Sequence, residues 1–131
     1  MPAAAGFPPV AVNWFGHAIR QQPEDLVRVQ EVLYRVRPDV IIETGIFQGG
    51  SLMFYASLCE AMKKGRVVGI DLRIPADVRE RISGHSLGPR ISLIEGDSAS
   101  PEVAIKAAAA IGADDVVMVI LDSCHTNDHV G

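Results

Sequence analysis

An acidic residue follows each of four short apolar runs in this sequence of 131 residues. The four acids are Glu43, Asp71, Asp97 and Asp122. If the runs are parallel strands of an open sheet, their carboxyl ends meet at one edge, where such sheets bind ligands. Carboxylates at that edge can accept hydrogen bonds, attract a cationic group or coordinate a hard metal ion. One acid at a strand end is an ordinary loop residue, but the fourfold pattern predicts a binding site.

Residues 43–51 form a glycine-containing loop, ETGIFQGGS, after the first apolar run. Its glycines permit a tight turn and let a ligand approach the backbone. Phe47 breaks the Gly-x-Gly-x-x-Gly pattern that a dinucleotide pyrophosphate needs at a helix N-terminus. The acid before the glycines instead favours a ligand with cationic groups, such as an amine and a sulfonium. The residues expected to bind it are Glu43, Gly45, Gly49 and Ser51. The alternative is a plain strand-to-helix turn.

The acids after the second and third runs suit the nucleoside part of such a ligand. Asp71 can accept hydrogen bonds from both hydroxyls of a ribose. Asp97 and Ser98 follow the third run and are placed to contact an adenine. The pattern therefore predicts one cofactor site that is shared by three strand ends.

Strands and helices alternate along the chain and would position these residues. The expected strands are 40–42, 67–70, 91–94 and 116–121, and the expected helices are 25–36, 52–62, 76–82 and 101–112. Gly65 is expected to end the second helix, and Ser100 to cap the fourth. This order predicts an α/β fold, a Rossmann-like parallel sheet with flanking helices and right-handed crossovers. We expect residues 1–22 to be an N-terminal tail or segment and residues 23–131 to form the N-terminal part of a Rossmann-like ligand-binding domain.

Composition excludes several classes of partner. A net charge of −4 argues against a nucleic-acid or anionic-membrane surface. No apolar run approaches the roughly 20 residues that span a bilayer. The 2 cysteines, Cys59 and Cys124, have no recognisable spacing and indicate reduced thiols, so a cytoplasmic location is expected. Trp14 is expected to be a packing anchor, and His17 and His85 are expected to lie on the surface.

The sequence resembles the cephalosporin hydroxylase family, whose members include rhamnosyl and macrolide-sugar O-methyltransferases. The matching stretches are 14–16, 25–26, 30–31, 37–45, 49–51, 69–71, 95–98 and 121–130. The resemblance implies the fold of a class I S-adenosylmethionine-dependent methyltransferase. It also implies a divalent-metal site, for Mg²⁺ or another divalent cation, that holds the hydroxyl of a small-molecule acceptor, a sugar or natural product.

Two residues of the last stretch match the family's catalytic residues. Asp122 matches its first metal ligand, and His125 matches the histidine proposed there as general base. A metal ion lowers the pKa of a bound hydroxyl, and a neutral histidine nearby can take the proton. The resulting alkoxide would attack the sulfonium methyl in line. For His125 the alternative is a loop histidine that makes a local cap.

The sequence departs from the family's pattern at its C-terminus. The family's other metal ligands, an adjacent Glu-Asp pair, follow a strand that would lie beyond Gly131. The resemblance therefore implies a truncated enzyme, with about three strands of a seven-stranded sheet missing. The strand 116–121 would then be an open apolar edge, and we expect self-association through it.

Two other functions remain open. Asp122, His125 and His129 could be the two histidines and one carboxylate of a non-haem iron oxygenase. Such a site explains none of Glu43, Asp71 and Asp97. The third possibility is a non-catalytic remnant that binds a nucleoside or a partner chain.

Overall fold

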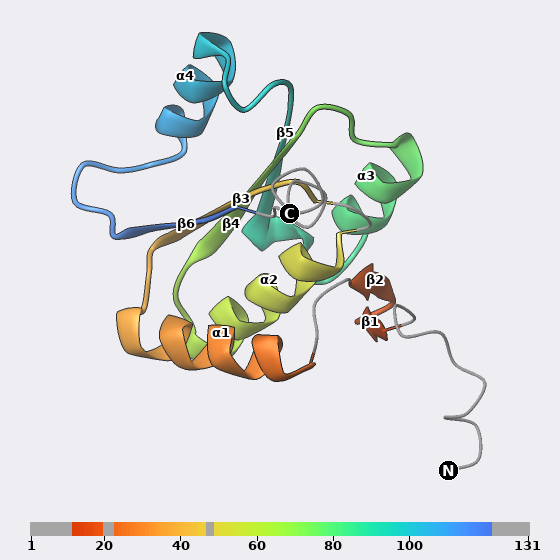
Figure 1. Cartoon of the computed structure of the whole chain (residues 1–131), viewed down its shortest axis with the longest axis vertical. Coiled ribbons are helices and arrows are strands. Elements are labelled where there is room, and N and C mark those ends of the chain that lie inside the picture. Colours follow the sequence, from red (N-terminus) through yellow and green to blue (C-terminus); the bar gives the residue numbers. More distant parts are fainter. Residues whose placement is uncertain (1–11, 20–22, 47–48, 122–131) are drawn as a thin grey trace, which may run out of the picture.

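A four-stranded parallel sheet forms the centre of the fold, in the order β5-β4-β3-β6 (Figure 1). The computed structural model describes residues 12–19, 23–46 and 49–121. The strands of the sheet are β3 (Val40–Thr44), β4 (Arg66–Asp71), β5 (Ile91–Glu95) and β6 (Val117–Leu121). The helices are α1 (Pro23–Val36), α2 (Gly50–Met62), α3 (Ala76–Ser83) and α4 (Pro101–Ala109), with a 3₁₀ turn, η2, at Gly88–Arg90. The expected α/β class and Rossmann-like parallel sheet are confirmed.

Helices cover both faces of the sheet, which explains why its inner strands are continuous apolar runs. On one face, Ile41 and Val67 pack in a core with buried residues of α1, α2 and α3. On the other face, Val40 and Val68 pack against Val103 of α4. Side chains alternate between faces along a strand, so Glu43 shares the face of Ile41, toward α2.

The C-cap of one helix and the end of another differ from the expected positions. The second helix ends at Met62, as expected, but its C-cap is Lys63 rather than Gly65, because Lys63 itself adopts a left-handed conformation with φ of 58°. The Lys63 and Lys64 N–H groups then donate to the carbonyls of Glu60 and Cys59, at 3.1 and 3.0 Å. The fourth helix ends at Ala109 instead of continuing to Gly112, although Ser100 caps it as expected.

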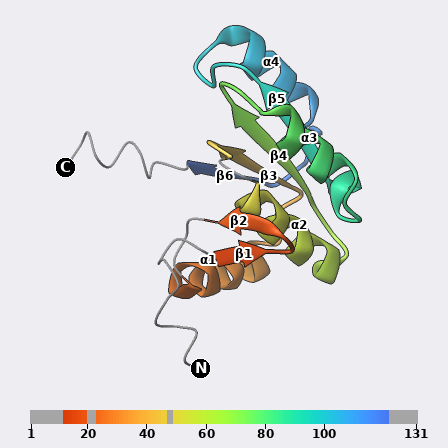
Figure 2. The same ribbon diagram turned by 90° about the vertical axis from the view of Figure 1, so that its right-hand side faces the viewer.

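A two-stranded antiparallel hairpin lies within the N-terminal segment that precedes α1. It consists of β1 (Val12–Trp14) and β2 (His17–Ile19), two strands that were not among the expected elements. Phe15 and Gly16 form its two-residue turn with φ of 49° and 86°, the signs of a type I′ turn. Figure 2 shows the hairpin beside α2, with α4 on the far side of the sheet.

Among the described residues, no helix is both long enough and apolar enough to cross a membrane.

Candidate functional site

The carboxyl ends of β3, β4 and β5 lie at one edge of the sheet, as the sequence predicts. Thr44 pairs in register with Ile70, and Asp71 pairs with Glu95. The acid at the true end of β5 is therefore Glu95, two residues before the expected Asp97. Sequence reasoning missed Glu95 because two acids flank Gly96 and only the strand register shows which one ends the strand.

Backbone hydrogen bonds hold the loop after β3 in place. The Gly45 N–H donates to the Ile70 carbonyl at 2.8 Å, and the Gly49 N–H donates to the Ile46 carbonyl at 2.7 Å. Gly45 and Gly49 have φ of 82° and 87°, in the left-handed region that favours glycine. Gly49 is the N-cap of α2 and provides no side chain to cap its first N–H groups. The loop thus brings the first turn of α2, without a side-chain cap, to the strand ends.

Asp71 links the loop to the next strand. Its Oδ2 accepts a hydrogen bond from the Ile46 N–H at 2.9 Å, and its backbone carbonyl accepts one from Gly96 at 2.7 Å. Asp71 is half-buried, and Ile46 is buried. The side chain is therefore oriented by the loop, while the residue stays partly accessible to a ligand.

Glu43 is fully buried on the α2 side of the strand end. The hydroxyl of Tyr55 in α2 donates to Glu43 Oε2 at 3.4 Å. If Glu43 is ionised in this site, water screens its charge weakly, and the charge acts over a longer distance than that of a surface acid.

Asp97 and Ser98 are exposed beyond the end of β5. Asp97 Oδ1 accepts a hydrogen bond from the Ala99 N–H at 2.9 Å, which makes a local turn. Glu95 Oε2 instead accepts from the Ile74 N–H at 3.2 Å and ties the segment before α3 to β5. The remaining loop residue, Ser51, is half-buried in the first turn of α2.

Asp122 and His125, the expected metal ligand and general base, lie outside the described residues, as does His129. Within residues 12–19, 23–46 and 49–121, no group of three or more His, Cys, Asp and Glu side chains could hold a metal ion. The metal site therefore stays a prediction from the sequence.

The hairpin contributes two side chains next to the loop. Trp14 is an anchor, as expected, because its Nε1–H donates to Ser57 Oγ at 3.0 Å and its ring meets Phe54 edge-on at 4.8 Å. The expectation that His17 lies on the surface is wrong, since this residue is only 3% exposed. It is buried by tertiary contacts, which cannot be predicted from the residues next to it in the sequence. His85, also expected on the surface, is half-buried.

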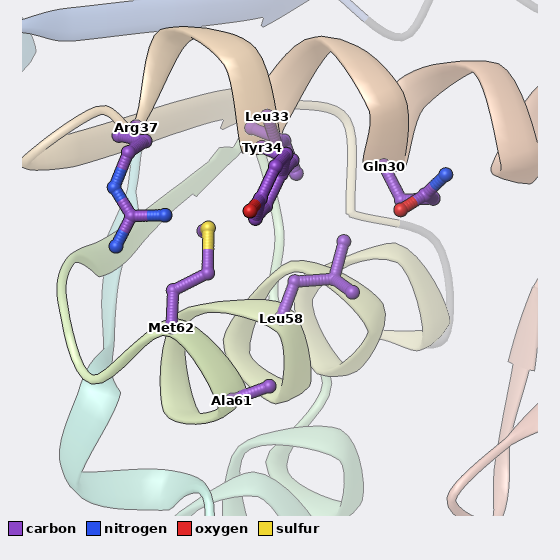
Figure 3. A pocket seen from close by; sticks show the side chains of 7 residues that line it. All are labelled: Gln30, Leu33, Tyr34, Arg37, Leu58, Ala61 and Met62. Atoms are coloured by element: carbon purple, nitrogen blue, oxygen red, sulfur yellow. The ribbon is translucent and has the colours of Figure 1, made fainter.

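A hollow of about 350 Å³ lies between α1 and α2, lined in part by Tyr34, Leu58 and Met62 (Figure 3). Its α2 residues are in the C-terminal half of that helix, whereas the glycine loop precedes the N-terminal end. This hollow is therefore separate from the strand-end site.

Comparisons with known proteins agree with the geometry of the sheet. The family described as "Rhamnosyl O-methyltransferase/CmcI" matches residues 9–131. A CmcI structure described with SAH aligns with a TM-score of 0.62 and 21% identity, over 99% of this chain and 66% of that chain. A CmcI structure described with Mg-SAM aligns with a TM-score of 0.62 and 21% identity, over 99% of this chain and 56% of that chain. An apo-structure of CmcI aligns with a TM-score of 0.64 and 23% identity, over 98% of this chain and 55% of that chain.

The structural matches show the fold alone, because sequence identities of 21–23% are too low to support a shared function. The chain spans between 55% and 66% of the lengths of these CmcI chains. No curated protein sequence matches.

Proposed function

Because the chain belongs to the rhamnosyl O-methyltransferase/CmcI family, a family of S-adenosylmethionine-dependent methyltransferases, we propose that it binds this cofactor at the carboxyl ends of β3, β4 and β5. The reaction that we propose is methyl transfer to a hydroxyl group of a sugar or natural product, with help from a divalent cation. The observation that carries the proposal is the pairing of Asp71 with the loop after β3.

The position and orientation of Asp71 support its proposed role as the ribose-binding acid. Its Oδ2 is held by the Ile46 N–H, which fixes the plane of the carboxylate at the end of β4. A carboxylate so oriented can accept hydrogen bonds from a pair of adjacent hydroxyls. Asp97 and Ser98, exposed after β5, would contact the adenine.

The loop after β3 favours a cationic cofactor over a dinucleotide. Gly45 and Gly49 let the ligand approach the backbone, and the buried Glu43 places negative charge beside it. That charge attracts the amine and sulfonium of S-adenosylmethionine and opposes a pyrophosphate. Ser51, in the first turn of α2, adds a hydroxyl group to the same loop.

The proposed acceptor chemistry depends on Asp122 and His125. A carboxylate such as Asp122 is a suitable oxygen ligand for a hard cation such as Mg²⁺, which would lower the pKa of a coordinated acceptor hydroxyl. His125 would take the hydroxyl proton as the oxygen attacks the sulfonium methyl. S-Adenosylhomocysteine and the methyl ether are then the products.

Equilibrium dialysis with labelled S-adenosylmethionine tests the proposal. We expect saturable binding that S-adenosylhomocysteine competes with and NAD does not. The same labelled cofactor, incubated with a panel of sugars and Mg²⁺, should yield methylated product that EDTA abolishes. Binding without transfer would favour the non-catalytic remnant. Iron-dependent consumption of oxygen without cofactor binding would favour the oxygenase.

A further inference from the structure

His17 is buried against the start of α2, although its hairpin lies outside the parallel sheet. A Cβ built on Gly49 would lie 3.4 Å from His17 Nδ1 and 3.1 Å from Ile82 Cδ1. The Gly49 backbone is therefore enclosed by the hairpin on one side and by α3 on the other. With φ of 87°, a side chain at position 49 would be strained, and its Cβ would lie in van der Waals contact with His17 and press on Ile82.

Gly49 determines how the glycine loop enters α2. Its N–H donates to the Ile46 carbonyl at 2.7 Å, and its carbonyl accepts from the Met53 N–H at 3.0 Å. The first of these bonds closes the loop, and the second begins the helix. A shift of Gly49 would therefore move both the loop and the first backbone N–H groups of α2.

The hairpin holds His17 in a defined place. His17 pairs in register with Trp14 across the hairpin, and Trp14 is the residue bound to Ser57 of α2. Ser57 in turn donates to the Phe54 carbonyl at 2.7 Å, so this contact also belongs to α2. A two-residue turn at Phe15 and Gly16 leaves the hairpin little freedom to slide.

We infer that His17 is a positioning residue for the proposed cofactor site. Its ring supports Gly49 from the hairpin side and fixes the backbone where the glycine loop becomes α2. His17 itself does not contact the cofactor; it acts through Gly49. The inference rests on the proposed function, and it makes cofactor affinity depend on an N-terminal hairpin that supplies no strand to the sheet.

Three variants separate this role from a general effect on stability. His17→Ala removes the ring, whereas His17→Asn keeps a polar atom near the position of Nδ1. Leu33→Val is the control, because Leu33 is fully buried on α1 and packs away from the glycine loop. All three should show the circular dichroism of the folded chain.

Hydrogen exchange of the ligand-free protein is the first measurement. In His17→Ala, the Gly49 and Met53 amides should exchange at least about fivefold faster than in the wild type, because their acceptors are no longer held in place. His17→Asn should restore most of the protection. In Leu33→Val, any increase should not be concentrated at these two amides. Unchanged protection of Gly49 and Met53 in His17→Ala would overturn the inference, whatever the ligand does.

Calorimetric titration with S-adenosylhomocysteine is the second measurement. We expect affinity at least about fivefold weaker in His17→Ala, close to the wild type in His17→Asn, and unchanged in Leu33→Val. Equal affinity in His17→Ala and the wild type would overturn the inference and leave the proposed function intact. If the wild type does not bind but exchange at Gly49 rises in His17→Ala, the proposed function fails. The positioning of this loop by His17 would then stand.

Discussion

The carboxylate of Asp71 accepts a hydrogen bond from the Ile46 N–H at 2.9 Å, which ties the end of β4 to the loop after β3. Neighbouring strands thus hold the proposed cofactor loop at its first half, and the hairpin and α3 enclose Gly49 at its second half. Gly45, Ile46 and Gly49 are therefore each held by contacts to neighbouring elements.

The contact between Trp14 and Ser57 should stabilise the hairpin on α2. Removal of its hydrogen bond in Trp14→Phe should lower the free energy of unfolding by about 1 kcal/mol, beyond the loss of ring contacts. A double-mutant cycle with Ser57→Ala isolates the pair, and we expect a coupling of at least about 0.5 kcal/mol. Since Trp14 is the single tryptophan, urea unfolding should be followed by circular dichroism. If the losses of unfolding free energy in the two single variants add up to the loss in the double variant, the contact contributes nothing to stability.

The thiol of Cys59 should be unreactive in the folded protein. Burial raises the pKa of the Cys59 thiol above its ordinary value, and Arg90 opposes this only in part. In Cys124→Ser, which leaves Cys59 as the single cysteine, labelling at pH 8 should follow the rate of unfolding. Rapid labelling at full amplitude under native conditions would contradict the burial.

The same pKa shift has a consequence for stability. A group with a raised pKa in the folded state contributes stability below its unfolded pKa and loses it as pH rises through the folded value. Unfolding free energy should therefore decline above about pH 8.5, the ordinary range of a thiol. Cys59→Ala should flatten this decline even though it makes the chain less stable at neutral pH.

The edge strand β6 should make the 131-residue chain self-associate. Within the described residues β6 pairs only with β3, and Val119 and Leu121 are 58% and 69% exposed. An apolar strand edge of this kind pairs readily with another, and a charge on it discourages pairing. Light scattering after size exclusion should show oligomers that Val119→Lys reduces. Val27→Lys, at an exposed position of α1, is the control and should leave them unchanged. A monomeric wild type at high concentration would contradict the prediction.

Asp122 should bind a divalent cation weakly in this chain. One carboxylate, with His125 nearby, leaves most of the coordination sphere to water. Magnesium or calcium titration followed by NMR should give millimolar affinity at best, which Asp122→Ala abolishes. A submicromolar stoichiometric site that survives Asp122→Ala would refute the assignment.

Much of the sheet could be predicted because its inner strands are buried on both faces. Apolar runs such as 40–42 are typical of strands that are buried on both faces of a parallel sheet. Ser100 followed by Pro101 is a helix start that depends on local chemistry alone. The end of α2 at Met62 was predicted, but its C-cap was not, because Lys63 takes a left-handed conformation for which glycine is the usual signal.

The hairpin and its histidine could not be predicted from local sequence. Each strand has three residues, too few for an alternating pattern, and Phe15 is an unusual residue for the first turn position. The burial of His17 depends on neighbours such as Gly49 and His85, which are distant in sequence. Whether Glu95 or Asp97 ends β5 likewise depends on the pairing of β5 with β4, which cannot be read from a sequence motif.

Calorimetric titration of S-adenosylhomocysteine into the wild type and Asp71→Ala tests the central claim most directly. Asp77→Ala is the matched control, since Asp77 is an exposed acid of α3 whose side chain forms a surface ion pair with Arg81. We expect the wild type and Asp77→Ala to bind alike, and Asp71→Ala to bind at least about tenfold more weakly, or about 1.4 kcal/mol. Undiminished affinity in Asp71→Ala, or equal or tighter binding of NAD by the wild type, would contradict the assignment of this strand-end site.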